Sequence, residues 1–109
     1  MLIRIVRLTL APAHVDTFHT HFASVAPRIR GFNGCRHLEL WADATHPNVM
    51  ITHSHWDDED ALRVYRESEV FRSTWAAVKP LFAARPQAFS AQVARTATTI
   101  ESDMERNDA

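Results

Sequence analysis

The sequence predicts a single domain of the α+β class, with an antiparallel sheet and two helices on one of its faces. Four segments alternate with a period of two, as strands do, and two intervening stretches repeat apolar residues at spacings of three and four, as helices do. A chain of 109 residues suffices for one such domain and one core. The order of strand, helix, strand, strand, helix, strand is the βαββαβ order of a ferredoxin-like fold.

The first strand and the first helix follow from the N-terminal pattern. Leu2–Leu10 is apolar on both faces, which is typical of a central strand. Pro12 ends this strand and opens a helix. One apolar stripe then runs along that helix: Val15, Phe18, Phe22, Val25 and Ile29. His19 and His21 are expected at the surface and not as a chelate, because helical residues two apart diverge by ~200°.

Residues Gly34–Trp56 are predicted to form a β-hairpin around a polar turn at Asp43–Asn48. A slip of one residue between its strands would move a whole set of side chains to the other face of the sheet. One register gathers His37, Glu39, Trp41, Thr52, Ser54 and Trp56. The other gathers His37, Glu39, His53 and His55. Periodicity alone leaves both registers open, because the turn is irregular.

The C-terminal half is predicted to complete the sheet. Four acidic residues, 57–60, favour a helix start, and Ser68 can cap a second helical piece that ends at Pro80. The inward-facing residues of this region are Ala61, Leu62, Tyr65, Phe71, Trp75 and Val78. Residues 87–95 form the last predicted strand. The domain therefore spans 1–95, and the polar, acidic residues 96–109 form a tail.

Composition excludes several classes of function. The net charge of −1 provides no strong field for nucleic acid or a membrane surface, and no apolar run reaches the ~18 residues of a membrane span. With two glycines, the chain has no glycine-rich phosphate loop. A single cysteine fits a reducing cytoplasm. The second sheet face has no helix left to cover it, so we expect a homodimer through the sheet faces.

Three segments resemble the antibiotic biosynthesis monooxygenase family: GCRHLEL at 34–40, THSHW at 52–56 and YRESEVFRSTW at 65–75. The resemblance covers about residues 1–95. It implies a dimeric α+β barrel with a pocket between the sheet and the helices of each subunit. The resemblance leaves several activities open, since the family includes cofactor-independent monooxygenases of phenolic polyketides, haem-degrading enzymes and isomerase-like proteins.

Residue-by-residue matching favours one branch of the family. The Asn, Trp and haem-ligating His of the haem-degrading enzymes correspond to Val6, Tyr65 and Trp75, so haem chemistry of that type is not expected. The quinone-forming monooxygenases place a polar residue and a Trp in the pocket, which correspond to Thr52 and Trp56. That match favours the register in which Trp41 and Trp56 face the same pocket.

The resulting prediction is a cofactor-independent monooxygenase that uses molecular oxygen on a small electron-rich aromatic or quinol. His37 would take a phenolic proton, since an imidazole with a pKa near ~6.5 is a usable base. Glu39 would orient it, Trp56 would stack on the substrate and Tyr65 would donate a hydrogen bond. The other predicted pocket residues are Val6, Trp41, Thr52, Phe71 and Trp75. No cofactor or metal is expected.

Two alternatives remain open. The same pocket could serve a dimeric binding protein or an isomerase-like protein that uses no oxygen. In the other hairpin register, His37, His53 and His55 would converge with Glu39, a set that suits zinc or non-haem iron.

Overall fold

The computed structural model of the protein describes residues 1–97 and confirms the α+β ferredoxin-like order. The strands are β1 (Leu2–Thr9), β2 (Cys35–Ala42), β3 (Val49–Trp56) and β4 (Gln87–Ala91). The helices are α1 (Val15–Arg30), α2 (Glu59–Arg66) and α3 (Glu69–Val78), with short 3-10 turns η1 (Pro12–His14) and η2 (Lys79–Leu81). Every neighbouring pair of strands is antiparallel, in the order β2-β3-β1-β4.

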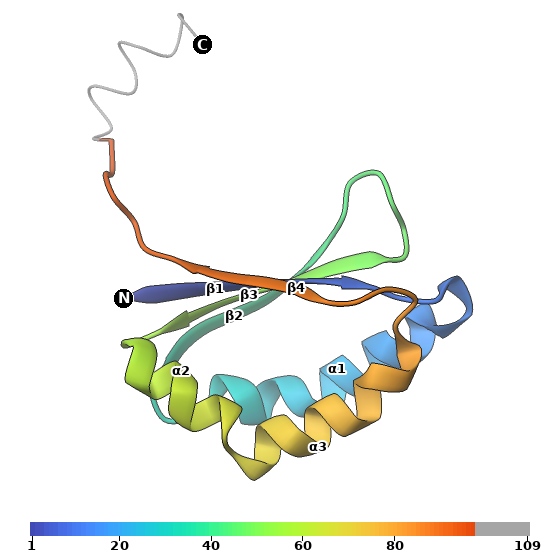
Figure 1. Ribbon diagram of the computed structural model, residues 1–109, viewed down its shortest axis with the longest axis horizontal. Coiled ribbons are helices and arrows are strands. Elements are labelled where there is room, and N and C mark those ends of the chain that lie inside the picture. The colour runs from blue at the N-terminus through green and yellow to red at the C-terminus, as the bar shows by residue number, and fades with distance from the viewer. Residues whose placement is uncertain (98–109) are drawn as a thin grey trace, which may run out of the picture.

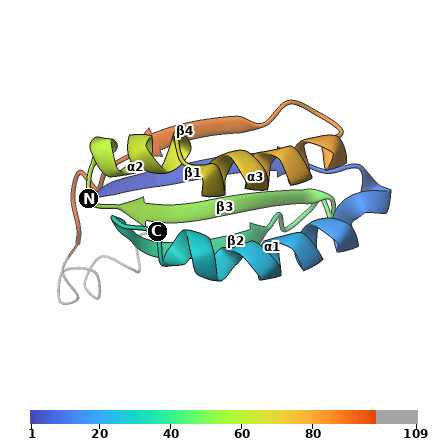
Figure 2. The same ribbon diagram turned by 90° about the horizontal axis from the view of Figure 1, so that it is seen from below.

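All three helices lie on one face of the sheet, which we call the helix face (Figure 1). Seen from below, α1 runs along β2, while α2 and α3 follow one another along the half of the sheet that holds β1 and β4 (Figure 2). We call the opposite face of the sheet the open face, because no helix of residues 1–97 covers it. The predicted dimer through that face stays a prediction.

Capping side chains divide the second helical region into two pieces. The Asp58 carboxylate accepts a hydrogen bond from the Ala61 N–H at 2.8 Å and opens α2. The Ser68 hydroxyl accepts one from the Phe71 N–H at 3.2 Å and opens α3, as the sequence predicted. These caps set where Tyr65, near the end of α2, and Phe71, at the start of α3, meet the sheet.

The core lies between the helices and the sheet, in two clusters. The first is built on buried Leu8, Leu10, Phe18, Met50 and Val78. The second is built on buried Leu2, Cys35, Trp56 and Leu62, with Phe32 and Tyr65 packed against it. Trp56 is 1% exposed, so a single strand-terminal indole fills the centre of the second cluster.

The hairpin adopts the second of the two registers, and our preference for the first was wrong. His37 pairs with His55, and Glu39 pairs with His53. The cause is an irregularity at the start of β2, where Cys35 pairs with Trp56 and Arg36 is the extra residue. Arg36 is held out of the ladder by a bidentate ion pair with Asp57, with N–O distances of 2.7 and 2.9 Å.

Because of this extra residue, each side chain that follows it in β2 lies on the opposite face of the sheet from the one that unbroken alternation predicts. Cys35 lies on the helix face with Trp56, but His37 and Glu39 lie on the open face. Trp41 follows them and is 41% exposed there. The three residues therefore cannot enter a pocket on the helix face.

The end of the chain is only partly described. Strand β4 ends at Ala91, earlier than the predicted Arg95. The predicted tail, 96–109, lies outside the described residues from 98 onward. No helix within residues 1–97 combines the length and the apolar character that a membrane crossing requires.

Candidate active site

A cavity of about 100 Å³ lies between the sheet and the helices. Strands β1 and β3 form its floor, α1 and α3 form its walls, and the end of α2 reaches it through Tyr65. Its lining is almost wholly apolar. A concave, mostly apolar space with a few polar groups is the usual form of a small-molecule site.

The cavity brings together five of the predicted site residues. They are Val6, Thr52, Tyr65, Phe71 and Trp75. Val6 and Thr52 are paired across β1 and β3, so their side chains share the floor. Phe71 and Trp75 lie one turn apart on α3, with ring centroids 5.7 Å apart. The helix face therefore presents two neighbouring aromatic rings above a short polar side chain.

Trp56 supports this cavity from the adjoining cluster. Its ring stacks on Tyr65 with centroids 4.8 Å apart and an interplanar angle of 26°. Its Nε1–H donates to the Ser54 hydroxyl at 3.0 Å, which satisfies the buried indole. The geometry gives Trp56 a packing role beneath Tyr65. Its predicted stacking on a substrate stays a prediction.

His37, Glu39 and Trp41 do not line the cavity, so their predicted place in one pocket with Trp56 was wrong, while their catalytic or binding roles stay predictions. All three lie on the open face, on the far side of the sheet from Tyr65 and Trp75. Their side chains contact one another and His53 instead. The base that we assigned to His37 must therefore come from another residue if the cavity is the site of reaction.

His21 is the functional candidate that the sequence analysis placed at the surface. It lines the cavity, and its Nε2 is buried without a hydrogen-bond partner among residues 1–97. A buried, unpaired imidazole nitrogen is costly and usually has a reason. The signal was present in the sequence, because His21 follows Phe18 by three residues and precedes Val25 by four, which places it on the apolar stripe of α1.

Tyr65 is held in its protonated form. Burial, with a smaller contribution from Cys35, raises the pKa of the Tyr65 hydroxyl from 10.0 to about 12. At neutral pH the side chain is therefore a hydrogen-bond donor and not a base. Within this cavity, His21 remains as the group that can accept a proton.

A direct titration can check the Tyr65 environment, because it is the sole tyrosine of the chain. We expect the ultraviolet absorbance of tyrosinate to appear with a midpoint of about 12 in the folded protein and near 10 in denaturant. The raised pKa means that the unfolded chain releases its proton first, so stability should fall as pH rises from 10 towards 12. A folded-state midpoint near 10 would show that the hydroxyl is exposed, and Tyr65→Phe provides the blank.

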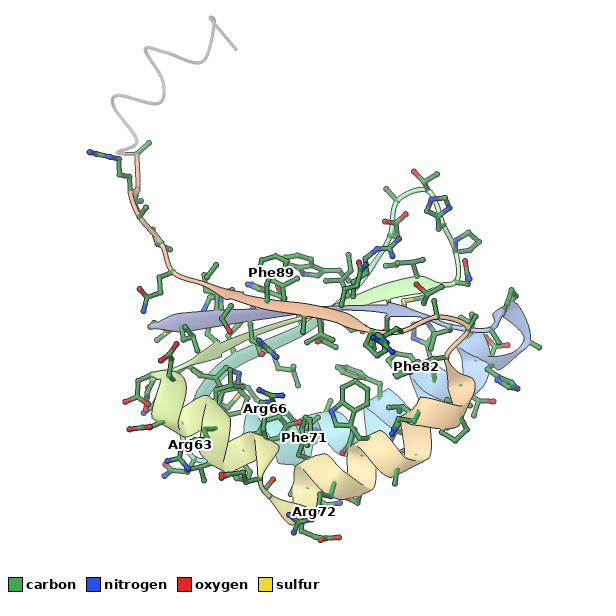
Figure 3. All side chains as sticks on the ribbon, in the orientation of Figure 1. Arg63, Arg66, Phe71, Arg72, Phe82 and Phe89 are labelled. Carbon is green, nitrogen blue, oxygen red and sulfur yellow. The ribbon has the colours of Figure 1, made fainter. Side chains whose placement is uncertain are left out.

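Two open clefts adjoin the cavity at Phe71. One, of about 610 Å³, is lined by Arg66, Phe71, Trp75 and Phe82, among others. The other, of about 400 Å³, includes Arg4, Arg66 and Phe71. Figure 3 looks onto this side of the molecule, with Arg66, Phe71 and Phe82 in the gap between the sheet and the helices. Phe71 thus lines the cavity and both clefts.

Comparison with known proteins identifies the fold and the family. A family model described as antibiotic biosynthesis monooxygenase matches residues 1–77. Solved structures named for the same family superpose closely: one from Caulobacter crescentus is 21% identical with a TM-score of 0.80, covering 86% of this chain and 90% of its own. One from Deinococcus radiodurans is 17% identical with a TM-score of 0.80, covering 90% and 97%.

A third, from Bordetella bronchiseptica, is 22% identical with a TM-score of 0.78, covering 86% and 97%. Among curated proteins, no sequence matches the chain significantly. At these identities the structural likeness establishes the fold, while the family model covers most of the sequence. The chain belongs to the antibiotic biosynthesis monooxygenase family.

Proposed function

We propose that this protein is a cofactor-independent monooxygenase that oxidises a small phenol or quinol in the cavity on the helix face. Family membership supports this class of reaction. The observation that carries the proposal is His21, which lines this largely apolar cavity and whose Nε2 is buried without a hydrogen-bond partner among residues 1–97. A phenolic hydroxyl in that cavity would supply the hydrogen-bond partner that this nitrogen lacks.

The size of the cavity limits the substrate. An engineered apolar cavity of roughly 150 Å³ binds benzene. The cavity here, at about 100 Å³, is smaller, and it shares Phe71 and Trp75 with an adjoining cleft. A single-ring phenol or quinol is therefore the substrate class that suits it, with Phe71 and Trp75 against the ring faces.

The proposed reaction balances with molecular oxygen as the oxidant. The phenol transfers its proton to His21 Nε2, and the electron-rich anion reduces oxygen as a C–O bond forms at a ring carbon. The O–O bond then breaks. One oxygen stays as the new quinone carbonyl, and the other leaves as water with two hydrogens from the substrate, one of them returned by His21. The Tyr65 hydroxyl, protonated at neutral pH, would donate to the oxygen that gains negative charge.

Oxygen uptake on a panel of phenol, hydroquinone and catechol tests this proposal. We expect uptake of one oxygen molecule per substrate, with one heavy-isotope oxygen atom entering the quinone product, and no hydrogen peroxide. Spontaneous oxidation, measured with heat-inactivated protein, is the control. Thermal stabilisation by the panel without oxygen uptake would support the alternative, a protein that only binds such ligands.

A further inference from the structure

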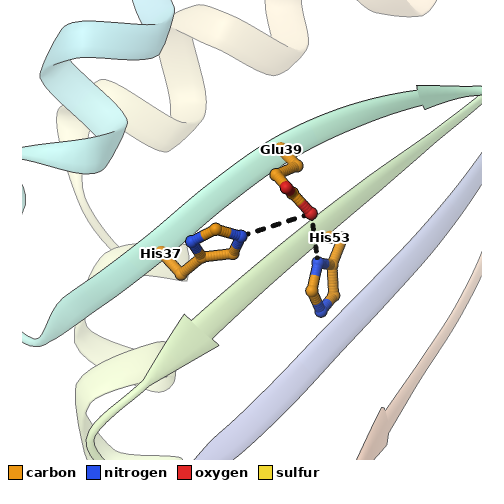
Figure 4. Close-up of side chains that lie close together, drawn as sticks. All are labelled: His37, Glu39 and His53. Carbon is orange, nitrogen blue, oxygen red and sulfur yellow. Dashed lines mark hydrogen bonds and ion pairs between the residues drawn. The ribbon is translucent and has the colours of Figure 1, made fainter.

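Four ionisable side chains converge on the open face, on the opposite side of the sheet from the proposed active site. His37 and Glu39 come from β2, and His53 and His55 come from β3. The register brings them together, because His37 pairs with His55 and Glu39 with His53. Figure 4 shows His37 and His53 turned towards the same oxygen of Glu39. None of these four residues lines the helix-face cavity.

The distances within this cluster suit a metal ion. The Glu39 Oε1 lies 3.2 Å from His37 Nε2 and 3.0 Å from His53 Nδ1. One ligand atom from each of the three residues lies within 4.8 Å of the other two. A tetrahedral ion with bonds of about 2.0–2.2 Å separates its ligand atoms by about 3.3–3.6 Å. Small side-chain adjustments would therefore place an ion between the three.

The groups around the three residues hold them in a ligand-ready form. The Trp41 Nε1–H donates to Glu39 Oε1 at 3.0 Å, which orients the carboxylate. Such outer-shell partners orient ligands in many metal sites.

His55 completes the second layer of the cluster. Its Nε2 lies 3.0 Å from His53 Nε2, the nitrogen of His53 that faces away from Glu39. A partner at His53 Nε2 can fix the orientation of the ring, with Nδ1 turned towards Glu39.

We propose that His37, Glu39 and His53 form a binding site for a divalent transition-metal ion, with Zn²⁺ and Fe²⁺ as the candidates. Two imidazoles and one carboxylate are a ligand set that both ions accept, whereas Mg²⁺ and Ca²⁺ favour all-oxygen sites. In the single chain the side chains of His37 and Glu39 are 42% and 47% exposed. Three protein ligands also leave a coordination position for water or a small ligand.

Metal binding to the purified, chelator-stripped full chain tests the site. Zn²⁺, Fe²⁺ under anaerobic conditions and Mg²⁺ would be added separately, with bound metal measured by elemental analysis and affinity by titration calorimetry. The variants are His53→Ala, which removes a ligand, and Glu39→Gln, which keeps the shape of the side chain but removes its charge. His46→Ala is the matched control, because His46 is an exposed histidine in the β2–β3 turn, outside the cluster.

We expect about one Zn²⁺ or Fe²⁺ ion per chain in the unaltered protein and in His46→Ala, and no Mg²⁺. The loss of affinity in His53→Ala and Glu39→Gln should exceed the ~10–100-fold that outer-shell partners contribute. Equal binding by the unaltered protein and both variants would overturn the proposal. So would the absence of bound metal, which would leave the cluster as a hydrogen-bonded network. Neither result would affect the proposed oxidation in the helix-face cavity.

Discussion

We expect His21→Gln to lower the rate of oxygen uptake by roughly 10²–10⁴-fold, the usual contribution of a positioned general base. Glutamine is close to histidine in size and keeps a polar group in the cavity, but it cannot accept the phenolic proton. The Nε2 of His21 is buried in the wall of the cavity, without a partner among residues 1–97. Steady-state oxygen uptake at saturating phenol or hydroquinone measures the effect, which should fall on kcat more than on KM.

His19→Gln provides the matched control, because His19 is exposed on the same helix and does not line the cavity. Its turnover should equal that of the unaltered protein. Thermal unfolding of both variants would show that α1 is intact. If His21→Gln retained full turnover in a folded protein, His21 would be removed from the mechanism.

Trp56→Ala is expected to reduce the free energy of unfolding by about 3–5 kcal/mol, the range for truncating a large buried aromatic side chain. Trp56 is 1% exposed, stacks on Tyr65 and meets Phe32 edge-on with ring centroids 6.5 Å apart. Its loss would also leave the Ser54 hydroxyl without the indole N–H that it now accepts. Equilibrium unfolding in urea measures the change.

Trp41→Ala is the comparison for Trp56→Ala, because Trp41 is 41% exposed on the open face. A substitution at such a position is expected to change stability by only about 0.5 kcal/mol. Equal losses for the two tryptophans would contradict the placement of Trp56 in the core and Trp41 outside it.

Local patterns sufficed to predict the fold. The apolar stripe of α1 correctly indicated a helix that buries Phe18, Val25 and Ile29. The Ser68 cap correctly divided the second helical region. These features depend on residues close together in the chain, where propensity and periodicity act directly.

The hairpin register could not be predicted in the same way. Alternation from Cys35 to Trp41 looks unbroken in the sequence, yet Arg36 is an extra residue that exchanges the faces after it. The ion pair with Asp57, 21 positions later, holds Arg36 outside the ladder. A pairing over that distance cannot be read from the periodicity of the strand. The error therefore moved His37 and Glu39 together to the wrong face.

Part of the candidate site could be predicted from the same local patterns that predicted the fold. Tyr65, Phe71 and Trp75 follow the helical pattern and do line the cavity. His21 was assigned to the surface because we placed it off the apolar stripe of the helix, although its spacing from Phe18 puts it on that stripe. Whether a histidine on such a stripe meets solvent or a cavity depends on what packs against the helix, which tertiary structure decides.

The most direct test of the account is a crystal structure of the protein with hydroquinone, prepared without oxygen so that the ligand is not consumed. We expect the ring between the sheet and α3, against Phe71 and Trp75, with a hydroxyl within roughly 2.6–3.2 Å of His21 Nε2. A ring bound instead on the open face beside His37 and His53 would contradict the account. That result would place the reaction on the open face and not in the helix-face cavity.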